Sequence, residues 1–252
     1  MKIKTYIINL KDSSERREYA LNETSKYACM DVELVEAVDG RILSSEEAGR
    51  LFGLKRFAYR YGRLPFPGEI GCTLSHRKCY RLLLDSAEEV ALILEDDVVF
   101  LFPEDTVRIL EDCARILCEK KEGLMTFSYH KVSFARGKDL SCGYRLHRVW
   151  WGFGSNACLV HRNTARKLLQ DAPASILADD YQYMNMAGVR VYGMTPNFST
   201  GLTTNQAIES VVQLEADKII PVRSIPLKYR LHNLCRGGFR RLMLLLGIMN
   251  EK

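Results

Sequence analysis

The sequence lacks several features that would place it in well-known classes of protein. No run of about 18 apolar residues occurs, so no membrane-spanning helix is expected. The eight cysteines include no CxxC pair and no paired Cys/His metal spacing, which excludes a zinc-finger type of domain. The apolar stretch in MKIKTYIINLKD is too short for a signal peptide. These absences predict free buried thiols in a reducing cytoplasm.

Acidic side chains are scarce in one part of the chain only, the C-terminal segment 218–252. This segment has eight basic residues and the single acid Glu251, a net charge of +7, whereas the whole chain carries +5 and residues 1–217 therefore −2. A body without a basic excess predicts no nucleic-acid partner. Residues 239–249 are cationic and then apolar, which is typical of a segment that lies on an anionic membrane. The alternative is a C-terminal helix docked into the core.

Apolar strands alternate with helical patterns along most of the chain. We expect strands at residues 5–10, 32–38, 90–94, 124–128 and 189–194. We expect helices at about 14–27, 69–87, 104–119 and 164–170, a short one from residue 44, and a loop at 55–68. This alternation predicts an α/β sandwich with a mostly parallel central sheet. No repeat is present, so we expect one catalytic domain, residues 1–217, followed by the basic segment 218–252.

Three consecutive acids, Glu95, Asp96 and Asp97, follow the apolar run VALIL. Ligands bind at the carboxyl ends of strands in open α/β sheets, and adjacent carboxylates need a cation or water to compensate them. In an extended chain Glu95 and Asp97 would share one side, an arrangement that suits a divalent cation with phosphate and water ligands. A solvated acidic turn is the alternative. The cluster indicates a metal–diphosphate site without separating nucleotidyl, glycosyl and phosphoryl transfer.

The segment GEIGCTLSH, residues 68–76, begins a helix with two glycines. Gly68 and Gly71 permit close approach of the backbone, and the free N–H groups of a helix start favour an anion. Read alone, His76 is more often a hydrogen-bonded structural residue than a catalyst. Arg16, close to the first strand, could reach phosphate, although a solvated helix face is the commoner explanation.

Together these motifs resemble glycosyltransferase family 25, which includes bacterial lipooligosaccharide galactosyltransferases and the related collagen galactosyltransferases. The resemblance rests on IINL near the start, GEIGCTLSH and then LEDD, and it extends through WWGFGSNACLV and ADDY to cover roughly residues 3–200. GEIGC-x-LSH followed by LEDD is a specific combination, whereas either piece alone would be weak. The resemblance implies a GT-A-like, Rossmann-type sandwich and inverting transfer of a hexose, usually galactose, from a UDP-sugar.

The resemblance also implies roles for individual residues. Asn9 and Leu10 match the start of the nucleotide pocket, and the three acids match the DxD-like element that holds manganese and the diphosphate. The residues expected to bind the nucleotide-sugar are Asn9, Leu10, Gly71, His76, Glu95 and Asp96. Asp97, with Glu95, is the expected ligand of a Mn²⁺ or Mg²⁺ ion, which would act as a Lewis acid on the leaving UDP.

An inverting transferase needs a base that takes the proton from the attacking acceptor hydroxyl. Asp179 and Asp180 are adjacent acids late in the chain. The family often has Pro-x-Asp here, and the residues that follow align its aspartate with Asp180. Asp180 is therefore the expected base, and the departure from the pattern keeps Asp179 as a second candidate. The alternative for Asp179 is that it caps the next helix, where Asp is favoured.

Trp150, Trp151 and Gly152 are the expected acceptor-binding residues, because aromatic rings stack on the apolar faces of sugars. Packing in the core is an equal alternative for at least one of the two tryptophans.

The sequence therefore predicts a metal-dependent UDP-sugar hexosyltransferase that acts on an oligosaccharide or a lipid-linked saccharide acceptor. We expect it in bacterial lipopolysaccharide or lipooligosaccharide assembly, in the cytoplasm and peripheral on the inner face of the inner membrane. Two alternatives stay open. A metal-dependent nucleotidyltransferase would bring a glycine-rich signature close to the first strand, which IINLKDSSERR lacks. A non-catalytic, membrane-associated saccharide-binding module would keep the same fold.

Overall fold

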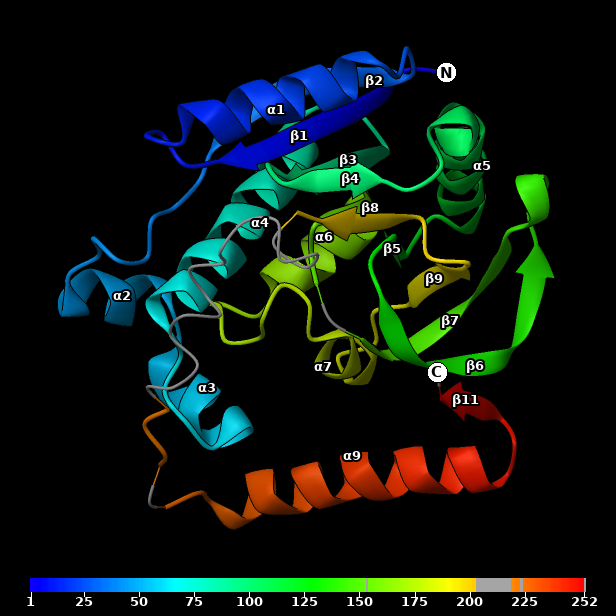
Figure 1. Ribbon diagram of the computed structural model, residues 1–252. Coiled ribbons are helices and arrows are strands. Elements are labelled where there is room, and N and C mark those ends of the chain that lie inside the picture. Colours follow the sequence, from blue (N-terminus) through cyan, green and yellow to red (C-terminus); the bar gives the residue numbers. More distant parts are fainter. Residues whose placement is uncertain (153, 203–218, 223, 252) are drawn as a thin grey trace.

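A nine-stranded sheet forms the centre of the molecule and is covered by helices on both faces (Figure 1). The structure is a computed structural model that describes residues 1–152, 154–202, 219–222 and 224–251. Phe153 of the Trp-Gly stretch and the basic residues Lys218, Arg223 and Lys252 lie outside the described residues.

The described elements follow one another as an α/β chain. The strands are β1 (Ile3–Asn9), β2 (Met30–Glu36), β3 (Val90–Glu95), β4 (Val98–Phe100), β5 (Leu124–Thr126), β6 (His130–Asp139), β7 (Arg145–Gly152), β8 (Ala157–His161), β9 (Val191–Thr195), β10 (Ser199–Gly201) and β11 (Met249–Glu251). The helices are α1 (Ser14–Ser25), α2 (Ser45–Leu51), α3 (Leu54–Tyr61), α4 (Pro67–Asp85), α5 (Pro103–Lys120), the 3₁₀ turn η1 (Ser141–Gly143), α6 (Arg162–Leu169), α7 (Tyr181–Met186) and α9 (Leu227–Leu245).

The strand order in the large sheet is β11-β6-β7-β9-β5-β8-β3-β1-β2, and β4 pairs separately with β10. Strands β2, β1, β3, β5 and β9 run in one direction, with β8 antiparallel between β3 and β5. Beyond β9, the strands β7, β6 and β11 alternate in direction. The predicted α/β sandwich is confirmed, but the sheet is mixed and not mostly parallel, because five of its eight described neighbouring pairs are antiparallel.

The alternation of side chains along β3 divides the core into two layers. Leu92 and Leu94 pack into a cluster with α1 and α5, whereas Ala91 and Ile93 pack with α4, α6 and α7 on the opposite face. Because both faces of β3 are buried, the strand is apolar at every position before Glu95. The carboxyl ends of β1, β2 and β3 consequently lie side by side at one edge of the sheet.

The predicted loop at 55–68 is wrong over its first half, where the chain forms α3. This helix buries Phe57 and Ala58, and it ends at Gly62, whose φ of 72° is a left-handed cap that glycine adopts without strain. The aromatic and basic side chains therefore belong to an amphipathic helix. Residues 150–152 belong to strand β7.

Helix α9, with no buried residue, lies along one side of the molecule (Figure 1). It contacts the body through aromatic pairs, with ring centroids 5.4 Å apart for Tyr59–Tyr229 and 4.8 Å apart for Trp150–Phe239. The C-terminal helix thus lies on the surface of the body and is not docked into the core, as the alternative had it. Within the described part of the chain, no helix has both the length and the apolar composition to cross a membrane.

Candidate functional site

A cleft of about 910 Å³ opens at the edge of the sheet where β1, β2 and β3 end, a size typical of ligand-binding pockets. Segments distant in the chain line it: Ile8, Leu10, Arg16, residues 37–41, the N-terminal half of α4, residues 95–97, residues 154–156, residues 177–179, Asn197, Ser199 and Thr200. The position agrees with the rule that ligands of open α/β sheets bind beyond the carboxyl ends of the strands.

Asp96 and Asp97 are held at the floor of the cleft by residues from the first strand and helix. Asn9 Nδ2 donates to Asp96 Oδ2 at 2.7 Å, and the Arg16 guanidinium forms an ion pair with Asp96. Arg16 Nη2 also lies 3.8 Å from Asp97 Oδ2. Burial raises the pKa of Asp96, and Arg16 acts against that rise. Arg16 is therefore a compensating cation for this pair of acids.

The extended conformation expected for residues 95–97 is wrong, because β3 ends at Glu95 and the next two residues form a turn. Asp96 and Asp97 both approach Arg16, whereas Glu95 contacts α4. The alternation of side chains along a strand therefore does not predict which of the three carboxylates faces Arg16 and which faces α4. The three carboxylates nevertheless all line the cleft.

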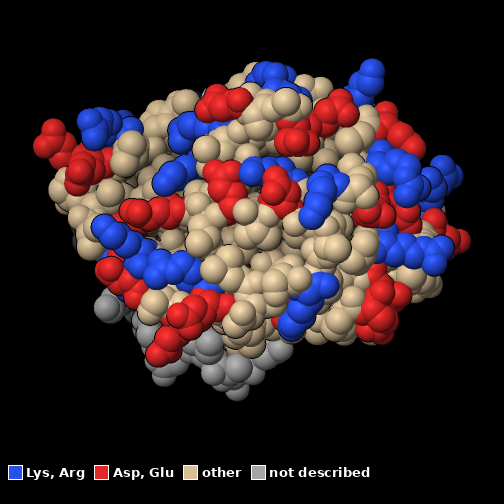
Figure 2. Space-filling model, turned by 90° about the horizontal axis from the view of Figure 1, so that it is seen from above, with Lys and Arg blue, Asp and Glu red and all other residues tan. Residues whose placement is uncertain are grey.

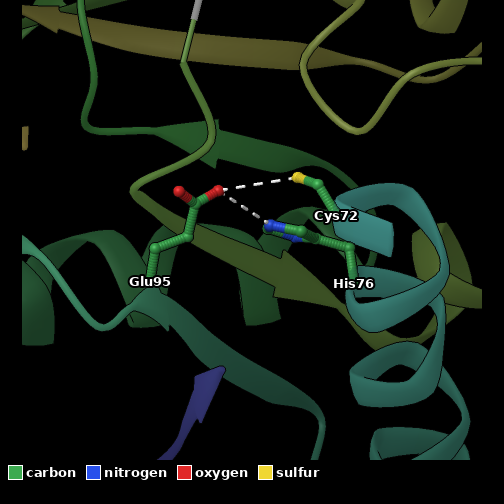
Figure 3. Close-up of side chains that lie close together, drawn as sticks. All are labelled: Cys72, His76 and Glu95. Atoms are coloured by element: carbon green, nitrogen blue, oxygen red, sulfur yellow. Dashed lines mark hydrogen bonds and ion pairs between the residues drawn. The ribbon is translucent and has the colours of Figure 1, made fainter. Parts of the chain in front are cut away.

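Glu95 lies against two residues that are one turn apart on α4 (Figure 3). Its Oε1 is 3.5 Å from His76 Nε2 and 3.7 Å from Cys72 Sγ, and it accepts a hydrogen bond from the Ser155 hydroxyl. Burial opposes ionisation of Glu95, but the contacts with His76 and Ser155 outweigh burial, so its pKa is lowered. Glu95 is thus held as a carboxylate beside a buried imidazole.

Two different donor sets in the cleft could hold a metal ion. The Cys72, His76 and Glu95 ligand atoms lie within 4.8 Å of one another, but a sulfur–nitrogen–oxygen set suits zinc, and burial raises the pKa of the Cys72 thiol. The carboxylates of Asp96 and Asp97 offer the oxygen ligands that Mn²⁺ and Mg²⁺ prefer. The residues present therefore fit the expected hard cation at the acids.

Of the other residues expected to bind the nucleotide, some line the cleft and one lies behind it. Leu10, Gly71 and His76 line the cleft, whereas Asn9 acts through Asp96. A Cβ at Gly71 would lie 2.4 Å from Val38 O, so the glycine is required for α4 to pack against the preceding turn. At the start of α4, where an anion was expected, the Glu69 carboxylate already accepts a backbone hydrogen bond, from the Phe66 N–H at 2.8 Å.

The two late aspartates, Asp179 and Asp180, have opposite surroundings. Asp179 lines the cleft, and its Oδ2 accepts the Gly154 N–H at 2.9 Å. Burial raises the pKa of Asp179 to about 6, and the charges of Asp180 and Glu95 add to the rise. Asp180 caps α7, its Oδ1 accepting the Tyr183 N–H at 2.9 Å, and is not among the described cleft residues. The alternative of Asp179 as the cap is not realised, because the helix begins one residue later and Asp180 is its cap.

Trp150, Trp151 and Gly152 lie in β7, outside the described lining of the cleft. Trp150 is 8% exposed and packs in a cluster with Val132 and Met249, while Trp151 lies beneath the cations Lys131 and Arg240. Their packing corresponds to the alternative of core side chains.

Ser155 and Asn156 line the cleft but were not expected there. They immediately precede β8, whose N-terminal end lies beside the carboxyl end of β3, and Asn156 O accepts the Glu95 N–H at 2.9 Å. The signal was the polar pair in GSNACLV. It was missed because β8 itself was not predicted.

Comparison with known proteins gives a family match over the first part of the chain. Residues 2–140 match the family described as glycosyltransferase family 25 (LPS biosynthesis protein). A glycosyltransferase 25 family member of Aedes aegypti is 30% identical over 185 residues, which are 71% of this chain and 30% of the relative. Human procollagen galactosyltransferase 2 is 37% identical over 98 residues, 38% of this chain and 16% of the relative. The chain thus spans less than a third of the length of these relatives.

Among solved structures, CMP:2-keto-3-deoxy-manno-octonic acid synthetase matches with a TM-score of 0.43 and 12% identity over 86% of this chain and 100% of that one. The glycosyltransferase GlyE of Streptococcus pneumoniae matches with a TM-score of 0.32 and 11% identity over 74% of this chain and 43% of that one. Likeness at this level is too low to assign a function.

Proposed function

Because the chain belongs to glycosyltransferase family 25, we propose that it transfers a hexose from a UDP-sugar to a saccharide acceptor. The observation that carries the proposal is the cleft itself, where the buried acids Asp96 and Asp97 and the carboxylate Asp179 line one cavity. The first two suit a metal–diphosphate group, and the third suits a base. A glycosyltransferase needs a metal–diphosphate site and a base in the same cleft.

On the donor side, Asp96 and Asp97 are the proposed metal ligands, in place of the expected pair Asp97 and Glu95, because Glu95 is engaged by His76 and Ser155. A Mn²⁺ or Mg²⁺ ion bound there would neutralise the charge that develops on the leaving UDP. Arg16 already pairs with Asp96 and lies on the cleft, so its guanidinium can turn towards the diphosphate. Leu10 and the backbone after β1 complete the proposed nucleotide side.

On the acceptor side, we propose that Asp179 is the base. As the acceptor oxygen attacks the anomeric carbon, its proton passes to the Asp179 carboxylate while the bond from that carbon to the UDP oxygen breaks. Attack opposite to UDP inverts the anomeric configuration. The Gly154 N–H fixes the orientation of the carboxylate, and a pKa raised to about 6 makes it a stronger base than an ordinary aspartate. Asp180, the other candidate, has its carboxylate engaged in the cap of α7.

The proposed donor is UDP-galactose, since several relatives are named procollagen galactosyltransferases. The proposed acceptor is a lipopolysaccharide or lipooligosaccharide saccharide, in keeping with the description of the family. We further propose a cytoplasmic location, peripheral on the inner face of the inner membrane.

Helix α9 supports the membrane part of the proposal. The side that faces away from the body carries a stripe of leucines, each at least half exposed: Leu227, Leu231, Leu234, Leu242 and Leu245. Lys228, Arg230 and Arg241 are exposed beside the stripe. The face seen from above in Figure 2, away from α9, instead has acidic and basic side chains interspersed. An apolar stripe flanked by cations is complementary to an anionic lipid surface.

Calorimetric titration of UDP with and without Mn²⁺ tests the donor side. We expect metal-dependent UDP binding that is lost in Asp97→Ala and kept in Glu104→Ala, an exposed acid on α5. Screening UDP-sugars for metal-stimulated hydrolysis then identifies the donor, with UDP-galactose expected first. UDP binding that ignores both metal and Asp97→Ala would refute the metal site, and binding without hydrolysis or transfer would indicate a saccharide-binding module.

A further inference from the structure

A second cavity, of about 250 Å³, lies next to the cleft along α4, and we call it the annex. It is lined by α4, the C-terminal part of α6 and the segment 170–178, together with Arg60, Met184, Ala187 and Val189. Four residues, Thr73, His76, Leu177 and Ala178, line both the annex and the cleft. The annex therefore adjoins the site, directly beneath the segment that carries Asp179.

The annex is lined by residues with buried polar atoms that form no hydrogen bond with any described residue. Thr73 Oγ1, Tyr80 Oη and His76 Nδ1 have no hydrogen-bond partner among the described residues. Their side chains are 3%, 3% and 1% exposed, and their spacing places them along one face of α4. A buried polar atom without a partner costs roughly 1–3 kcal/mol, so three in one cavity indicate that the cavity holds a partner for them.

The charges around the annex favour an anion as that partner. Arg77 is 7% exposed and donates to the carbonyls of Leu168 and Leu169 at 2.8 and 3.1 Å, but no carboxylate of the described residues forms an ion pair with it. Arg60 and Lys167 add two more cations to the lining.

The one carboxylate in the described lining of the annex is already engaged. Asp171 lies 3.4 Å from Arg60 Nη1, and its Oδ2 accepts the Ser175 N–H at 2.7 Å. Positive charge at the annex is thus in excess. Capping of α6 explains why Arg77 is buried, but it leaves the hydroxyls of Thr73 and Tyr80 unexplained.

We propose that the annex is an anion-binding site for a phosphate or carboxylate group, to which Tyr80 and Thr73 donate hydroxyl hydrogen bonds and Arg77 supplies the charge. The group is either part of the acceptor or a free anion. The idea that the anionic group belongs to the acceptor rests on the proposed transferase function. The anion site itself does not, because binding of an anion requires no activity.

The test titrates inorganic phosphate into the full chain saturated with UDP and Mg²⁺, so that the diphosphate position of the cleft is already filled. We expect saturable binding that weakens about tenfold in Tyr80→Phe and in Thr73→Val, because a hydrogen bond to a charged group is lost. Without phosphate, neither variant should lower the Tm, since neither hydroxyl forms a hydrogen bond within the described part of the chain. Tyr59→Phe, at a tyrosine that lines neither cavity, is the matched control.

Charge is tested separately with Arg77→Lys against Arg81→Lys, an exposed arginine on the same helix. Only the former should weaken phosphate binding. Competition between phosphate and a lipooligosaccharide acceptor in a transfer assay would identify the acceptor as the source of the anion, and absence of competition a free anion. No phosphate binding, or equal binding by wild type, Tyr80→Phe and Thr73→Val, would overturn the anion site. A failure of transfer would leave these binding results unchanged and would count against the proposed function alone.

Discussion

At the scale of single residues, Asp179 and Asp180 show how surroundings separate two identical side chains. One is held by a single backbone N–H in a cleft that withdraws it from water, and the other completes the hydrogen bonding of a helix start. Desolvation disfavours charge on Asp179, so its pKa is raised to about 6. A carboxylate that binds its proton more tightly is the better proton acceptor, which is why we assign the base to Asp179.

The raised pKa of Asp179 predicts the pH dependence of transfer. The base must be ionised to accept the acceptor proton, so kcat/KM should rise with pH through about 6 and level off above it. An ordinary aspartate would place this rise near pH 4. Initial rates between pH 4.5 and 8 with donor and metal saturating measure the profile. A rate that is constant down to pH 5 would contradict the assignment.

Neutral substitutions of the two aspartates should have opposite effects. Asp179→Asn should reduce transfer at least 100-fold while UDP binding persists, because general-base contributions are typically 10² to 10⁴. Asp180→Asn should keep most of the activity, since Asn is also a good N-cap and the carboxylate lies outside the described cleft lining. Full activity in Asp179→Asn would move the base elsewhere.

The variant Asp179→Asn should also be more stable than the wild type at neutral pH. A folded-state pKa above the unfolded value of 3.8 means that the folded state binds the proton more tightly, so stability falls as pH rises from about 4 to about 6. At pH 7 the ionised Asp179 therefore costs stability, on the order of 1–3 kcal/mol. Asp179→Asn should remove this cost, and thermal unfolding at pH 4 and pH 7 should show a higher Tm at pH 7 only.

At the scale of elements, the sequence predicted those whose burial leaves a strong pattern. β3 is apolar at every position because both of its faces are covered, and α4 and α5 carry long amphipathic patterns, so all three were expected within a few residues. β6 and β7 were not expected, because β6 is exposed over its second half and its register with β7 shifts repeatedly. Strands held mainly by pairing with a neighbour leave no periodic signal in their own residues.

The candidate site shows the same division. The acids after β3 and the glycines of α4 could be located from the sequence, since each follows or begins a strongly patterned element. The sequence could not predict which acid pairs with Arg16 and which with His76, because the pairing depends on a two-residue turn after Glu95. The surroundings of Asp179 depend equally on Gly154, which is distant in the sequence.

Helix α9 leads to a prediction about membrane binding. Replacing Leu231 and Leu234, which are 51% and 71% exposed, by Gln should reduce binding to anionic phosphatidylglycerol vesicles at least tenfold, because burying each leucine is worth about 1.5–3 kcal/mol. Vesicle sedimentation measures the loss. Ile42→Gln, at an isoleucine 80% exposed outside α9, is the control and should bind as the wild type does.

Two results would count against this role of α9. If the wild type and the double variant bind vesicles equally well, the leucine stripe does not mediate membrane attachment. A change of oligomeric state in the double variant, without any vesicle binding by the wild type, would show that a second copy of the chain covers the stripe.

At the scale of the whole molecule, the cleft exists only when several separate segments have come together. Asn9 and Arg16 from the N-terminal β1 and α1 hold Asp96, while His76 of α4 and Ser155, two residues before β8, hold Glu95. No single segment contains a complete binding site. Ligand affinity is therefore coupled to the folding of the entire domain, because the unfolded chain cannot bind in the same way.

This coupling predicts stabilisation by the donor product. At a UDP concentration 100 times its Kd with Mn²⁺ present, the folded state should gain about 2.7 kcal/mol, which raises the Tm by roughly 5–10 °C for a chain of this size. Differential scanning calorimetry with UDP alone, Mn²⁺ alone and both together separates the contributions. Asp97→Asn should lose the increment that requires both, and Glu104→Gln, on the exposed start of α5, should keep it. A wild-type Tm that does not move with UDP and Mn²⁺ together would mean that the assembled acids bind no metal–diphosphate, and the donor side of the proposed function would have to be abandoned.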